Sequence, residues 1–131
     1  MELKPNMYVR TKDGYIDKIL LVEYAEEKRQ QYPNHPSKKH WRDKILLLKA
    51  GYWRTTQNII KASHNIIDLI EPEDYVNGVE VIGKEFDNFN EEYLQCGVGD
   101  YVICTYNSNE IEDVVTKEQF SAMEYRLGDD K

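Results

Sequence analysis

The side chains that could perform catalysis or bind a metal do not occur in patterns typical of either. His35 and His40 lie in a lysine-rich stretch without an acid or a thiol at ligand spacing, and His64 stands alone after a serine. Cys96 and Cys104 are separated by eight positions, which fits neither a metal site nor a redox motif, so we expect reduced thiols in or near a sheet. The sequence contains no glycine-rich phosphate loop and no nucleophile elbow. We therefore expect no catalytic residue, no metal and no cofactor.

Acidic side chains are numerous, but they occur in hydrophilic, turn-like segments. General acid–base catalysis needs a carboxyl group in a pocket that shifts its pKa. The densest clusters, at 71–74 and 91–92, lack apolar surroundings of that kind. The pattern favours solvated acidic faces, and hence a binding protein rather than an enzyme.

A basic segment is the first candidate for contact with a partner. From Lys28 to Lys49 there are seven Lys or Arg residues against one acid, Asp43. An indole ring among cations suits single-stranded nucleic acid, because the cations neutralise phosphates and the ring stacks on a base. The alternative is a solvated loop anchored by an inward-facing tryptophan. The candidate contact residues are Lys38, Lys39, Trp41 and Arg42.

An acidic, aromatic segment at 86–93 is the second candidate. From Asp68 to Lys131 there are seventeen Asp or Glu residues against four Lys or Arg. In a helical turn, the rings at positions 86, 89 and 93 would share one face while the acids project elsewhere. Such a face suits a basic protein groove; the alternative is that the rings are core and the acids are solvated. The candidate contact residues are Asp87, Phe89, Glu91, Glu92 and Tyr93.

The elements that would position these segments are mainly short β-strands. Asp13-Gly14 and Asn77-Gly78 separate runs of β-forming residues, which predicts two hairpins. Further strands are expected at 44–49, 101–106 and 111–115. The polar stretch at 25–43 carries two prolines, and we expect a long loop that opens with a short helical turn.

Two helix starts can be predicted from capping residues. Thr116 and Gln119 match a capping box, and Val115 with Phe120 matches the accompanying apolar staple, which predicts a short C-terminal helix. We expect residues 124–127 to return to a strand. Ser63 is expected to cap one helical turn that includes residues 66 and 67.

A weak repeat bears on the fold class. A tyrosine–valine step recurs at Met7-Tyr8-Val9, Asp74-Tyr75-Val76 and Asp100-Tyr101-Val102. Such steps begin the strands of SH3-like barrels, and equally those of any antiparallel sheet with half-buried Tyr and Val. We predict a mainly β (α+β) protein with a single domain at 1–131 and a basic loop insertion at about 25–43. The expected architecture is a small antiparallel sheet or SH3-like barrel with hairpins and a short C-terminal helix.

Hydropathy indicates a cytoplasmic protein. No apolar run approaches the roughly 20 residues that a membrane helix needs, and the first five residues do not resemble a signal peptide.

Four segments occur together in a familiar order, at 7–16, 59–70, 74–78 and 114–120. The order resembles that of small accessory proteins encoded by phages and prophages of Listeria, Clostridium and related Gram-positive bacteria. The matching segments are strands, turns and one capped helix, and the family brings no established reaction and no site residues. The chain departs from the family pattern in the long basic insertion within 25–53 and at Pro72-Glu73.

The resemblance implies a function in the cytoplasm of a bacterial host. Phage accessory loci often encode inhibitors of bacterial defence, including anti-CRISPR proteins. The resemblance therefore suggests a non-enzymatic inhibitor whose acidic half occupies, as a DNA mimic, a basic groove of a host defence protein such as a Cas nuclease. An excess of acidic over basic residues also fits an ordinary soluble protein. The alternative function is nucleic-acid binding by a small barrel through the basic, Trp-containing loop.

Overall fold

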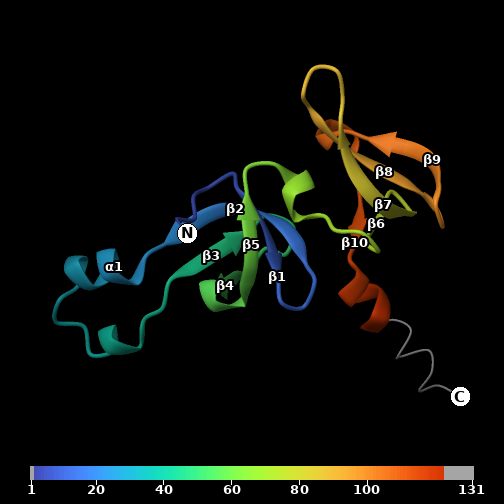
Figure 1. Cartoon of the computed structure of the whole chain (residues 1–131). Helices are drawn as coiled ribbons and strands as arrows, with labels where there is room; N and C mark the ends of the chain where they lie inside the picture. The colour runs from blue at the N-terminus through green and yellow to red at the C-terminus, as the bar shows by residue number, and fades with distance from the viewer. Residues whose placement is uncertain (1, 123–131) are drawn as a thin grey trace, which may run out of the picture.

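The computed structural model describes residues 2–122, which form two antiparallel five-stranded sheets (Figure 1). The first sheet contains β1 (Tyr8–Thr11), β2 (Ile16–Glu23), β3 (Lys44–Leu47), β4 (Trp53–Thr55) and β5 (Ile59–Ser63). The second contains β6 (Tyr75–Val76), β7 (Val79–Phe86), β8 (Glu92–Val98), β9 (Tyr101–Tyr106) and β10 (Val114–Val115). The predicted mainly β class is confirmed, and neither of these described sheets closes into a barrel.

The helical elements are short and lie between or after the strands. Helix α1 (Ala25–Gln31) opens the basic insertion, as expected, and residues 117–122 form the predicted C-terminal helix. The 3-10 helices are η1 (Lys38–His40), η2 (Thr56–Asn58), η3 (Ile66–Leu69) and η4 (Ser108–Glu110). None of the helices within residues 2–122 has the length and apolar character needed to cross a membrane. The predicted strand at 124–127 lies outside the described residues.

The two sheets repeat one topology. Their strand orders are β4-β3-β2-β1-β5 and β9-β8-β7-β6-β10, so in each a four-stranded meander is completed by a fifth strand that pairs with the first. A 3-10 helix precedes the fifth strand in both sheets, η2 before β5 and η4 before β10. Tyr8 and Tyr75 therefore begin equivalent strands, whereas Tyr101 begins the fourth strand of the second sheet. Two of the three tyrosine–valine steps mark this structural repeat.

Each sheet has its own apolar core. The core of the first sheet contains Leu3, Met7, Val9, Ile19, Ile45 and Leu47. The core of the second contains Ile67, Ile70, Val76, Val81, Leu94 and Cys96. Ile16 of β2 packs against the second core, so the two repeats are in contact.

Both predicted hairpin turns are present, and local side chains explain two differences from the sequence-based expectation. Asn77 and Gly78 have φ angles of 51° and 84°, as a two-residue type I′ turn requires. The η3 helix is capped by Asn65, whose side chain accepts a bond from the backbone N of Ile67, and not by Ser63. The last strand is limited to 114–115, because the Asn77 carboxamide holds the backbone NH groups of residues 112 and 113 in a loop.

A buried ionic junction links the two sheets. Arg10 of β1 and Asp74, just before β6, are both fully buried. Nη1 of Arg10 lies 2.5 Å from Oδ2 of Asp74 and 2.9 Å from the carbonyl oxygen of Leu69, and Nη2 donates to Glu118 at 2.6 Å. Asp74 also accepts bonds from the backbone N of Glu71 and of Lys117. The junction therefore ties the first sheet, the linker and the C-terminal helix together.

The C-terminal helix begins in direct contact with the first hairpin. Thr116 and Gln119 form the predicted capping box. The Thr116 hydroxyl is buried and donates to the carbonyl oxygen of Gly14 at 2.6 Å. A Cβ atom at Gly14 would lie 2.4 Å from that hydroxyl oxygen, so only glycine permits this approach.

Candidate partner-binding surfaces

The two segments predicted to contact a partner occupy the same place in the two repeats. The basic segment connects β2 to β3, and the acidic segment connects β7 to β8, so each joins the second strand of a sheet to the third. Figure 1 shows them well apart, with α1 at the left end of the molecule beyond the first sheet and the β7–β8 turn projecting at the top of the second sheet. The cations of the basic segment therefore do not cover the carboxylates of the second sheet.

The acidic segment forms the tip of a β-hairpin and not the helical turn in which its three rings would share a face. Phe86 pairs with Glu92, and the preceding residue pairs with Tyr93. Oδ1 of Asp87 accepts bonds from the backbone N of Phe89, at 2.8 Å, and of Glu91, at 3.0 Å, which closes the turn. Because neighbouring residues of a strand face opposite sides, the rings of Phe86 and Tyr93 do not share a face.

The two phenylalanine rings at this tip are bare. Phe89 is 86% exposed and Phe86 is also exposed, so the alternative that they are core residues is wrong for both. Tyr93 is half-buried in β8. The ion pairs within residues 2–122 involve neither Glu91 nor Glu92, so their carboxylates are not neutralised by a neighbouring cation.

A polar depression of about 500 Å³ lies beside the tip. Its lining combines carboxylates with carboxamides and reaches from the tip to η3 and η4. Among the residues that line it are Asp68, Phe86, Asn90, Glu91, Glu92 and Asn107. The acidic character of the tip thus continues into a concave surface.

The basic segment is folded around its tryptophan. Trp41 is half-buried, with Nζ of Lys28 4.5 Å from its ring centroid and the ring of His35 at 5.0 Å. Arg29 donates to the carbonyl oxygens of Trp41, at 2.8 Å, and of Lys38, at 3.0 Å. These contacts agree with the interpretation of Trp41 as the anchor of the loop.

The remaining candidate residues of the basic segment are at its surface. Lys38, Lys39 and Arg42 are exposed, and Lys38 donates through Nζ to the carbonyl oxygen of Pro33. The structure therefore brings the four basic-segment candidates together as a cationic surface over a packed ring. It does not bring this group near the acidic group, which lies in the other repeat.

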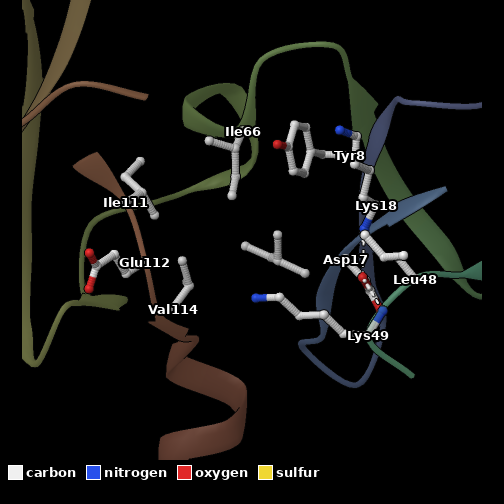
Figure 2. A pocket seen from close by; sticks show the side chains of 10 residues that line it. Tyr8, Asp17, Lys18, Leu48, Lys49, Ile66, Ile111, Glu112 and Val114 are labelled. Atoms are coloured by element: carbon white, nitrogen blue, oxygen red, sulfur yellow. Dashed lines mark hydrogen bonds between the residues drawn. The ribbon is translucent and has the colours of Figure 1, made fainter. Parts of the chain in front are cut away.

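A groove of about 330 Å³ between the sheets was not predicted from the sequence (Figure 2). Ile16 and Lys49 line it from the first sheet, Ile66 from η3, and Ile111 and Val114 from the second repeat. Asp17 also lines the groove from the first sheet. Its carboxylate already accepts hydrogen bonds from the backbone N of residues 18, 49 and 50. The lining residues come from distant parts of the chain, so no local pattern could have indicated this groove.

The thiols and the acids form no metal site within residues 2–122. Cys96 and Cys104 face each other across β8 and β9 as free cysteines, a proximity that their spacing did not suggest. Burial, together with the neighbouring Cys104, raises the pKa of Cys96 to about 11. Cys96 is therefore a thiol at neutral pH and a weak nucleophile.

No protein-family model, curated protein or solved structure matches this chain. Function must therefore be inferred from the chemistry of the surfaces themselves. One surface that differs from an ordinary mixed surface is the bare acidic tip of the second sheet.

Proposed function

We propose that this protein is a non-enzymatic binding protein whose acidic second repeat docks into a basic groove of a partner protein. The observation that carries the proposal is the β7–β8 tip, where exposed rings of Phe86 and Phe89 adjoin carboxylates that form no ion pair with a cation of residues 2–122. Exposed aromatic rings supply the apolar contact area that dominates many interfaces. Uncompensated carboxylates supply steering and charge complementarity.

The charge distribution supports a cationic partner. Between positions 65 and 122 the sequence has only two cationic side chains, Lys84 and Lys117. Lys117 is already 3.1 Å from a carboxylate oxygen of Glu71. The cations of the basic segment lie at the far end of the first repeat, away from the second repeat, so they do not cancel its negative potential (Figure 1).

The partner class that we propose rests on the resemblance to phage and prophage accessory proteins. It is a host defence protein with a cationic channel for nucleic acid, such as a Cas nuclease, and the mechanism is steric occupation of that channel. In this mechanism Glu91 and Glu92 take the place of phosphates and Phe89 is the anchor. Asp87 holds the turn and Tyr93 supports it from β8.

Nucleic-acid binding through the basic segment is the second candidate function. The exposed Lys38, Lys39 and Arg42 favour it, because they could contact phosphates. The packing of Trp41 against Lys28 and His35 makes this function less favourable, because stacking on a base would compete with these contacts.

Affinity capture from the lysate of a phage-infected host, read by mass spectrometry, tests the first function against the second. Reversal of two charges in Glu91→Lys/Glu92→Lys should lower the captured partner at least tenfold. Glu26→Lys/Glu27→Lys, the same charge change at exposed positions of α1, should not. Capture that is unaffected by the tip variant would refute the acidic docking surface. Capture that is lost after nuclease treatment of the lysate would favour the second function.

A further inference from the structure

The two cysteines of the chain form a pair at the edge of the second core. Cys96 of β8 and Cys104 of β9 are directly opposite each other in the antiparallel strand pair. Cys96 is a buried member of the second core, and Cys104 packs against the same core, so both side chains lie on one face of the sheet. The function proposed above uses neither thiol.

The backbone geometry of such a pair suits a disulfide. Opposite residues of an antiparallel pair have Cα atoms about 4.5 or 5.5 Å apart, and both separations lie in the range of about 4.4–6.8 Å found in disulfides. Their Cβ atoms are about 4.5–5.5 Å apart, compared with about 3.5–4.5 Å in a disulfide, so the strands must close by about 1 Å. The register shift directly after Cys96 leaves Ile103, next to Cys104, without a partner in β8. Because this shift interrupts the ladder, the strands can make that adjustment locally.

We propose that Cys96 and Cys104 are a site of reversible oxidation, at which they form a cross-strand disulfide by exchange with a small disulfide such as glutathione disulfide. The structure shows the reduced state, in which both cysteines are free. A disulfide whose geometry is not ideal is reduced more easily than an ordinary structural one, so the bond should be reversible. The inference does not depend on the proposed function.

Burial determines the order of the two exchange steps. Cys104 is half-buried on an edge strand, whereas Cys96 is fully buried and has its pKa raised to about 11 by burial and by the neighbouring Cys104. The Cys104 thiolate therefore attacks first and bonds to one sulfur of glutathione disulfide, whose S–S bond breaks and releases one glutathione. Cys96 then gives its proton to water and attacks Sγ of Cys104, which releases the second glutathione. Two protein thiols are oxidised to one disulfide, and one glutathione disulfide is reduced to two thiols.

The disulfide would fasten an edge strand to its sheet. Within residues 2–122, β9 pairs with β8 alone, so in the reduced chain it is held by one ladder and by its contacts with the core. A covalent bond between the two strands restricts the unfolded chain and thereby favours the folded state. By linkage, folding must favour formation of the disulfide by the same factor.

Equilibration of the full chain with mixtures of reduced and oxidised glutathione, followed by acid quenching and intact-mass spectrometry, tests the inference. The equilibrium constant for the internal disulfide should be at least tenfold larger for the folded chain than for the chain unfolded in 8 M urea. Cys96→Ser should stop at a mixed disulfide of Cys104 with glutathione. Cys104→Ser should keep a free thiol while it is folded, because Cys96 is fully buried.

The double variant Cys104→Ser/Thr105→Cys is the matched control. It moves the second thiol by one residue to the opposite face of β9, where Thr105 is exposed, and almost preserves the separation along the chain. Folding should disfavour its disulfide. A wild-type equilibrium constant that is no larger in the folded than in the unfolded chain would overturn the inference. A folded wild type that stops at the mixed disulfide, or a control that matches the wild type, would also overturn it.

Discussion

Replacing Arg10 by methionine would test the buried junction directly, because this change removes the guanidinium group and keeps most of the side-chain volume. Arg10 is fully buried and contacts Asp74 and Glu118. Burial disfavours its charged form, but the hydrogen bonds that Arg10 donates to Asp74 and the charges of Asp74 and Glu118 outweigh this and raise the pKa of Arg10. Arg10 is therefore positively charged at neutral pH, and the substitution leaves the side chains of Asp74 and Glu118 without their cationic partner.

The expected loss of stability follows from the geometry. Removing one partner of a buried ion pair costs about 3–5 kcal/mol. Asp74 would keep its bonds from the backbone N of Glu71 and Lys117, so we expect about 3 kcal/mol. That is a large share of the roughly 5–15 kcal/mol that stabilises a typical protein of this size. With a urea dependence of about 1.5–2 kcal/mol per M, the midpoint of unfolding should fall by about 1.5–2 M.

Urea unfolding at pH 7, followed by circular dichroism, measures this loss. Arg42→Met is the matched control, because Arg42 is exposed and forms no ion pair with an acid of the described chain, and it should change stability by less than about 0.5 kcal/mol. Adding Asp74→Asn to Arg10→Met should recover part of the loss, because it removes an uncompensated buried charge. A loss below about 1 kcal/mol in Arg10→Met would refute the conclusion that the ionic junction stabilises the contact between the repeats.

Two further substitutions probe the same region by urea unfolding. Gly14→Ala should destabilise the protein by at least about 1 kcal/mol more than Gly51→Ala. Both glycines have a positive φ, but only Gly14 is packed against the C-terminal helix. Equal losses of stability in the two variants would contradict that packing. Burial alone would raise the pKa of Glu71, but hydrogen bonds from Lys117 and Lys61 and the charge of Arg10 lower it to about 2. The stabilisation that Glu71 contributes should therefore be present above about pH 4.5 and be lost as the pH falls towards 2. Glu71→Gln should lower the free energy of unfolding by about 1 kcal/mol at pH 7, after solvent screening, and by less at pH 3. A loss of stability that does not change with pH would contradict this.

The elements that sequence patterns predicted correctly are those whose stabilising contacts are local. The Asp13-Gly14 and Asn77-Gly78 turns form because glycine and asparagine adopt positive φ at little cost. The capping box at Thr116 forms because its two partners are three residues apart. The mainly β class follows from the same short-range preferences.

The tip at 86–93 shows where such patterns fail. The spacing of Phe86, Phe89 and Tyr93 matches a helix face, but pairing of β7 with β8 over several residues outweighs that local preference. The Asp87 carboxylate then closes the turn, with Asn90 at a φ of 65°. The predicted contact residues of this segment remain together at a surface, although in a β-hairpin and not in a helical turn.

Local patterns could not indicate which charges are buried or which strands lie at an edge. Arg10 and Asp74 are 64 residues apart, and nothing in their surroundings in the sequence distinguishes them from solvated charges. They meet because Arg10 of β1 reaches the linker before β6 and the start of the C-terminal helix, where the two repeats join. In the same way, β9 was recognisable as a strand, but its exposure follows from the strand order. Short-range chemistry is therefore readable along the chain, whereas burial and edge exposure depend on how the two sheets are assembled in space.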